Sequence, residues 1–239
     1  MTERESFTPE KTTEQLSPTE VLHSIIDTQR APSPEYQFLI RGQEGSVSRE
    51  HSDNFVDHWH HDLSSRTTKD ILNDCLRNYL ADKILVDLGG GQGEMGDIAH
   101  DFGASTYINV ERAPYDETEA IDPSTPIEHQ RKENFLSLRV HADMLDFVSR
   151  LRDGSIDNFV INGIDTYIID NPRYHDALVK EILRATKKGG LIFGRSSDVL
   201  EDMERHVQAC EYEKRPIDLP VRLMEHVEFS NSIFFEKTE

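Results

Sequence analysis

A glycine-rich turn between two apolar segments constrains this sequence more than any other feature. Residues 84–88 (ILVDL) are apolar apart from Asp87, and the next five residues read GGGQG. A helical pattern follows, and then a second apolar segment that ends in Glu111. Glycines at the end of a strand let a ligand approach the backbone, and the following helix presents its positive N-terminal end. The sequence therefore predicts a unit that binds a nucleotide-like ligand, with the Glu111 carboxylate accepting hydrogen bonds from ribose hydroxyls.

Short apolar segments and helical patterns alternate through the rest of the chain. With helices between them, we expect five parallel strands, at residues 84–88, 106–110, 137–141, 158–162 and 191–194. Residues 221–229 and 233–235, separated by a polar turn, predict a closing hairpin. These patterns indicate an α/β fold: a doubly wound, mostly parallel seven-stranded sheet with a C-terminal antiparallel hairpin, preceded by N-terminal helices.

Two connections of this predicted sheet depend on turn residues. The helix before the fifth strand is expected to end on residues 187–190 (KKGG), because glycines are common just after a helix. Residues 112–136 are a long polar stretch, which we interpret as a lid, a binding loop or a flexible connector.

The N-terminal part of the chain lacks this alternation. Residues 1–16 are polar and without aliphatic periodicity, so we expect a disordered tail. Ser17, Pro18 and Glu20 form a capping box that opens a short helix, and residues 36–45 are expected to be extended. We therefore divide the chain into a tail (1–16), an N-terminal helical or cap segment (17–64) and a ligand-binding domain (65–239).

Composition narrows the partners and the location. The net charge is -19 and no run of Lys and Arg offsets it, which disfavours nucleic acid and favours a small-molecule substrate. The two cysteines show no CxxC spacing, so neither a disulfide framework nor a zinc site is indicated. No segment has the roughly 20 apolar residues of a membrane span, and no secretion signal is present. We therefore expect a cytoplasmic protein without membrane contact.

Two glycine spacings overlap in the turn and point to different ligands. Gly91, Gly93 and Gly96 satisfy GxGxxG, the dinucleotide fingerprint. Gly89, Gly91 and Gly93 satisfy GxGxG, with Asp87 two residues before the first glycine. This second pattern resembles motif I of the class I S-adenosylmethionine-dependent methyltransferases, in which the acid reaches the amino group of the cofactor's methionine part, usually through water. A carboxylate at that place would repel a pyrophosphate, so Asp87 favours S-adenosylmethionine.

The resemblance continues downstream over about residues 65–236. In that family the acid ending the second strand holds the ribose hydroxyls, and Glu111 has the matching place. An acid after the third strand commonly receives the adenine amine, which matches Asp143, and Met144 can pack on the ring; Asp143 is equally suited to cap a helix. Residues 153–165 resemble the fourth motif, so backbone near Asn162 is expected to line the cofactor. The resemblance implies methyl transfer as the activity.

Three residues are candidates for contacting the methyl acceptor. A sulfonium is already a good leaving group, so alignment of the acceptor matters most, with a base where the acceptor is protonated. Our candidates are His61, in the histidine-rich segment 51–65, and Asp165 and Tyr167 after the fourth parallel strand. The histidine segment could also ligate a metal. Adjacent histidines point in divergent directions, however, and no distant partner cluster is evident, so no metal site is predicted.

Other interpretations stay open. A nicotinamide-dependent oxidoreductase could use the GxGxxG glycines, although no YxxxK spacing follows the later strands. A methyltransferase fold could also serve as a non-catalytic binding or regulatory protein. The string DNPRY (170–174) resembles the NPPY motif of amino-group methyltransferases. Because Arg173 replaces the second proline and Asn171–Pro172 is a typical helix start, we interpret it as a helix cap.

Overall fold

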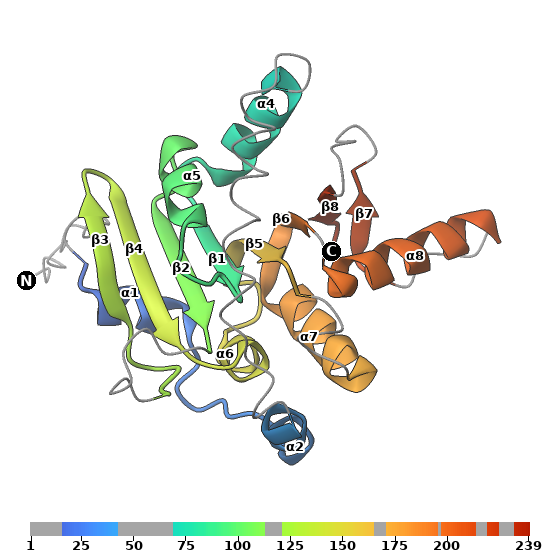
Figure 1. Cartoon of the computed structure of the whole chain (residues 1–239), viewed down its shortest axis with the longest axis horizontal. Coiled ribbons are helices and arrows are strands. Elements are labelled where there is room, and N and C mark those ends of the chain that lie inside the picture. Colours follow the sequence, from blue (N-terminus) through green and yellow to red (C-terminus); the bar gives the residue numbers. More distant parts are fainter. Residues whose placement is uncertain are drawn as a thin grey trace, which may run out of the picture.

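The computed structural model describes residues 16–42, 69–112, 121–164, 171–195, 197–213, 219–224 and 232–239. Within these residues one sheet has the strand order β3-β4-β2-β1-β5-β6-β8-β7 (Figure 1). Its parallel strands are β1 (Ile84–Leu88), β2 (Thr106–Glu111), β4 (Phe135–His141), β5 (Ile156–Asn162) and β6 (Thr186–Arg195). β8 (Ser232–Lys237) is antiparallel to β6 and to β7 (Val221–Leu223). The predicted doubly wound sheet with a closing antiparallel hairpin is therefore confirmed.

Helices cover both faces of the sheet, so the strands are apolar on both sides. On one face, α4 (Lys69–Leu80) and α5 (Met95–Asp101) pack on a cluster that includes Leu85 and Tyr107. The helices of the other face are α1 (Pro18–Ile25), α2 (Pro34–Gly42), α6 (Met144–Arg150), α7 (Pro172–Ala185) and α8 (Asp198–Tyr212). Asp87, the polar exception in β1, lies two residues after Leu85 and shares its face of the sheet, the face that α5 covers.

None of the helices in the described ranges is long and apolar enough to cross a membrane.

The N-terminal helices dock on the sheet domain. Ser17 caps α1 through the predicted capping box, and after this helix Ile26 forms a bridge with Leu151. The expectation that residues 36–45 are extended was wrong for residues 36–42, because they belong to α2, and residues 43–45 lie outside the described residues. The Ser33 hydroxyl accepts a hydrogen bond from the Tyr36 amide (3.2 Å) at the start of this helix, and Leu39 is buried in the main core. The limits of the predicted tail and segments stay predictions, since residues 1–15 and 43–68 lie outside the described residues.

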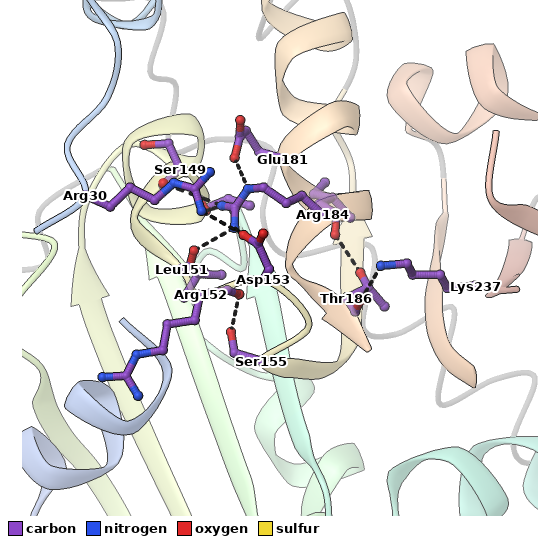
Figure 2. A network of polar contacts seen from close by, with 12 residues as sticks. Arg30, Ser149, Leu151, Arg152, Asp153, Ser155, Glu181, Arg184, Thr186 and Lys237 are labelled. Atoms are coloured by element: carbon purple, nitrogen blue, oxygen red, sulfur yellow. Dashed lines mark hydrogen bonds and ion pairs between the residues drawn. The ribbon is translucent and has the colours of Figure 1, made fainter. Parts of the chain in front are cut away.

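An arginine of α7 ties this N-terminal part to the rest of the fold. Arg184 pairs with Asp153 and Glu181, both at 2.6 Å, and donates to carbonyl oxygens at the end of α6 (Figure 2). Arg30 pairs with the same Asp153 (2.8 Å), and the Tyr36 hydroxyl donates to the same Glu181 (3.1 Å). One arginine and two shared acids therefore join α6, α7 and the segment that leads into α2.

The long polar stretch before β4 contains a strand that the sequence did not predict. β3 (Ile127–Lys132) pairs antiparallel with β4 through a turn at Glu133 and Asn134, and Asn134 is left-handed (φ 60°). β3 lies at the edge of the sheet and is largely exposed, so its side chains carry no apolar alternation. The sheet therefore has eight described strands, where seven were expected.

The glycines that were expected to end a helix belong to a strand. α7 ends at Ala185, and β6 begins at Thr186, whose hydroxyl donates to the Ile182 carbonyl (2.6 Å). Next to Gly190 the β5–β6 register shifts, and a Cβ on this glycine would lie 2.3 Å from the Asp157 carbonyl oxygen. Glycine is required here by the close approach of two strands.

Candidate functional site

The predicted site residues come from four neighbouring strands. β4, β2, β1 and β5 are adjacent and parallel, so their carboxyl ends lie at one edge of the sheet (Figure 1). In register, Asp87 pairs with Asn109, and Glu111 pairs with His141, two residues before Asp143. Asn162 ends β5. Ligands of open α/β sheets bind at this edge.

The loop after β1 has a backbone that requires glycine. Gly89, Gly91 and Gly93 have positive φ angles of 72°, 53° and 83°. Gly90 is constrained by space instead, because a Cβ on it would lie 2.5 Å from an oxygen of Asp87 and 2.7 Å from an oxygen of Asn109. The glycine cluster therefore lets the loop lie directly on the polar side chains of β1 and β2.

Two side chains of β2 hold this loop. The Gly91 amide donates to the Glu111 carboxylate (3.0 Å), and the Asn109 amide group donates to the Gly91 carbonyl (3.0 Å). Glu111 is thus brought beside the loop, as the predicted ribose-binding acid should be. The hydrogen bond to the Gly91 amide also gives the Glu111 carboxylate a structural role in holding the loop.

Asp87 lies buried under the glycine turn. Its Oδ2 atom accepts a hydrogen bond from the Tyr107 hydroxyl (2.7 Å), while its Oδ1 atom is buried and has no hydrogen-bond partner among the described residues. Burial raises the pKa of Asp87 to about 7, against the lowering effect of the Tyr107 hydrogen bond, and the nearby charge of Glu111 raises it further. The site thus contains a buried acceptor atom that a ligand or a bound water can use.

Asp143 caps α6, as the alternative interpretation of this residue expected. Its Oδ1 atom accepts hydrogen bonds from the amides of Leu145 (2.9 Å) and Asp146 (3.2 Å) and from the Tyr174 hydroxyl (2.9 Å). Its Oδ2 atom lies 3.6 Å from the Arg112 guanidinium. Burial raises the pKa of Asp143, and these donors and Arg112 oppose that rise.

Two apolar side chains meet over the first glycine of the loop. A Cβ on Gly89 would lie 2.6 Å from Ile164 Cδ1 and 3.5 Å from Met144 Sδ. Met144 directly follows Asp143, and Ile164 follows the end of β5. The predicted residue Met144 is therefore adjacent to the glycine loop. The Asn162 side chain accepts a hydrogen bond from the Arg195 amide (3.2 Å), so it also joins β5 to β6.

The catalytic candidates His61, Asp165 and Tyr167 all lie outside the described residues. The histidine segment 51–65 does so too. Among the residues that the structure does describe, no three His, Cys, Asp or Glu side chains gather as metal ligands.

Sequence reasoning missed several residues of this site. Tyr107 and Asn109 contact Asp87 or the loop, and they precede Glu111 in β2 at two-residue spacing. Their alternation on one face of a strand is a signal that could have identified them. Tyr174 and Ile164 carry no such signal.

A polar cleft of about 250 Å³ opens between the start of α5 and the β3–β4 hairpin. Gln92, Gly93, Glu94 and Gln130 are among its lining residues. Of the predicted cofactor-binding residues, Gly93 alone lines this cleft, and Asp87 and Asp143 do not.

No protein-family model matches this chain, and neither does any curated protein sequence. It is similar to solved structures of methyltransferases. One is the MycE methyltransferase from the mycinamycin biosynthetic pathway in complex with Mg, SAH and mycinamycin VI (15% identity, TM-score 0.46, covering 75% of this chain and 48% of that chain). Another is a ribosomal protein L11 methylase from Lactobacillus delbrueckii subsp. bulgaricus (16% identity, TM-score 0.41, covering 70% of this chain and 77% of that chain). A third is an rRNA methylase from Streptococcus thermophilus (16% identity, TM-score 0.39, covering 71% of this chain and 95% of that chain).

This chain spans about half the length of the MycE protein.

Proposed function

We propose that this chain is an S-adenosylmethionine-dependent methyltransferase that acts on a small-molecule acceptor. The observation that carries the proposal is the buried Asp87 oxygen under the glycine turn, which has no partner among the described residues. A carboxylate at this place attracts the ammonium group of a methionine tail and repels a pyrophosphate. It therefore favours S-adenosylmethionine over a nicotinamide dinucleotide.

The other predicted residues at the carboxyl edge of the sheet suit the ribose and the adenine of this cofactor. Glu111, beside the Gly91 amide, would accept hydrogen bonds from the ribose hydroxyls. Met144 and Ile164 would form apolar walls for the adenine ring, with Asp143 at its edge. When bound, the cofactor supplies a methyl group on a positively charged sulfur.

The chain's own contribution to the reaction is mainly positional. Methyl transfer needs the acceptor atom aligned with the methyl group at about 3 Å, and a base where the acceptor carries a proton. We propose Asp165 and Tyr167, which follow β5 in sequence, and His61 as the candidates for contacting the acceptor. The net charge of -19 supports a small acceptor over a nucleic acid.

Titration calorimetry of the full chain with S-adenosylhomocysteine and with NADH tests the cofactor. We expect binding of S-adenosylhomocysteine and none of NADH. The reverse result would favour the oxidoreductase, and binding of neither would favour a non-catalytic protein. An Asp87→Asn variant should bind S-adenosylhomocysteine about tenfold more weakly, whereas Asp101→Asn, an exposed acid on α5, should bind normally.

The acceptor needs a second measurement. The chain is incubated with S-adenosylmethionine labelled in the methyl group and with a cell extract divided into small-molecule, RNA and protein fractions. Label transferred to the small-molecule fraction supports the proposal. Label found in RNA or protein alone contradicts the small-molecule acceptor and leaves the methyl transfer intact.

A further inference from the structure

A buried tyrosine of α7 contacts the carboxylate that is predicted to receive the adenine amine. Tyr174 is fully buried, and its hydroxyl donates to Asp143 Oδ1 (2.9 Å) and accepts from the Leu145 amide (3.2 Å). It belongs to the string DNPRY, in which Asn171 caps α7 as expected. The cap explains Asn171 and Pro172, but it does not explain the contact of Tyr174 with Asp143.

The hydrogen bonds to Asp143 divide its two oxygens into different roles. Oδ1 accepts from two amides of α6 and from Tyr174. The amides alone satisfy an N-cap, so the tyrosine adds a third donor from a different helix. Oδ2 has the Arg112 guanidinium at 3.6 Å, which is longer than a hydrogen bond. Tyr174 and the cap therefore fix the rotation of the carboxylate and leave Oδ2 able to accept from a ligand.

The surroundings of this carboxylate suit an aromatic base. Met144, the residue that follows Asp143, meets Ile164 over Gly89, so this acceptor is next in sequence to one of two apolar side chains at the glycine loop. Apolar walls with one placed acceptor select a flat ring that carries an amino group.

On the basis of the proposed function, we propose that Tyr174 is a positioning residue that orients Asp143 Oδ2 toward the 6-amino group of adenine and so gives the site its preference for an adenine cofactor. Tyr174 acts through Asp143 and does not itself touch the ligand. A purely structural tyrosine would affect all ligands of the site equally. A positioning tyrosine affects ligands with the amino group more than those without it.

The test compares two ligands in titration calorimetry of the full chain. One is S-adenosylhomocysteine, and the other is its analogue with hydrogen in place of the 6-amino group. We expect the unmodified chain to prefer the first ligand about tenfold, the effect of one hydrogen bond to a charged acceptor. In Tyr174→Phe this preference should fall to about threefold or less, while affinity for the analogue changes less than about twofold.

Two further variants sharpen the result. Asp143→Asn should abolish the preference, because the amide oxygen takes the Oδ1 place at the three donors and its NH₂ group replaces Oδ2. Tyr79→Phe is the matched control, since the Tyr79 hydroxyl also donates to a carboxylate, that of Glu236 (2.7 Å), and it should keep the preference. Titrations at low temperature keep a destabilised Tyr174→Phe variant folded.

The outcomes separate this inference from the proposed function. If the unmodified chain binds neither ligand, the proposed function fails. If it binds both with the expected preference and Tyr174→Phe keeps that preference, or loses affinity for both ligands equally, the role of Tyr174 is overturned. An Asp143→Asn variant that keeps the preference overturns it as well.

Discussion

The Glu111 carboxylate accepts a hydrogen bond from the Gly91 amide at 3.0 Å, so the last residue of β2 holds the centre of the glycine loop. A carboxylate has lone pairs for several donors, so Glu111 could keep this bond while it accepts hydrogen bonds from the ribose of the proposed cofactor. Under the proposed function, loop geometry and ligand binding therefore depend on the same side chain.

Substitutions of Glu111 should separate these two roles. Glu111→Gln keeps an acceptor for the Gly91 amide and should weaken S-adenosylhomocysteine binding by about threefold to tenfold, whereas Glu111→Ala removes both functions and should weaken it by about 30-fold or more. Calorimetry measures both affinities. Glu128→Gln, an acid of the edge strand β3, is the control and should bind normally. Equal losses in Glu111→Gln and Glu111→Ala would mean that the loop contact contributes nothing.

Asp87 should make stability depend on pH. Its pKa is raised from 3.8 to about 7 in the folded chain, so between these values the folded state binds more protons than the unfolded state. The contribution of Asp87 to stability therefore falls as the pH rises through this range and is lowest above about pH 7. Asp87→Asn should raise the melting temperature at pH 8 and flatten its dependence on pH.

Thermal unfolding between pH 5 and pH 8 checks this expectation, with Asp101→Asn as a control because its side chain is 74% exposed. The assignment fails if Asp87→Asn and Asp101→Asn show the same pH dependence.

Gly90→Ala should destabilise the loop by overlap alone. The new methyl group would lie 2.5 Å from Asp87 Oδ2, so either the loop or the carboxylate must move. We expect a loss of about 2–3 kcal/mol in the free energy of unfolding, measured with denaturant, and weaker S-adenosylhomocysteine binding. Gly42→Ala is the control. A Cβ on Gly42, at the end of α2, would have no atom within 4 Å, so this variant should be neutral or slightly more stable. A neutral Gly90→Ala would show that the loop lies farther from Asp87.

Arg184→Met should destabilise the whole fold, because it leaves the buried Glu181 carboxylate and the last carbonyls of α6 without this donor. A loss of about 2–4 kcal/mol is expected in denaturant unfolding. Arg205→Met removes an exposed pair with Asp202 on α8 and should cost less than about 0.5 kcal/mol. Similar losses in the two variants would contradict the role of Arg184.

The parts of the fold that the sequence predicted are those with local signals. β1, β2 and β5 are buried apolar segments, and the acids Asp87 and Glu111 lie at or near their ends, so the edge that carries the site could be inferred from spacing. β3 could not, because an exposed edge strand lacks apolar periodicity. α2 was missed, although Pro34 stands in its first turn, where a proline is compatible with a helix.

The contacts that were missed at the site are mostly long-range. Tyr174 and Asp143 are 31 residues apart and meet through the packing of α7 against α6, which no spacing along the chain reveals. Tyr107 and Asn109 had a local signal, their alternation with Glu111. Its meaning depends on the register of β1 and β2, which only the folded sheet fixes.

The docking of α1 and α2 has a consequence for where this chain can be divided. Leu22, Ile25 and Leu39 share one apolar core with Phe147 and Leu178 of the sheet domain. A shortened protein that starts at α4 would leave the surfaces of α6 and α7 in contact with water, and aggregation would be its expected fate. α1 and α2 thus complete the apolar core on this face of the sheet. We therefore expect the smallest stable piece of this molecule to begin well before the glycine motif.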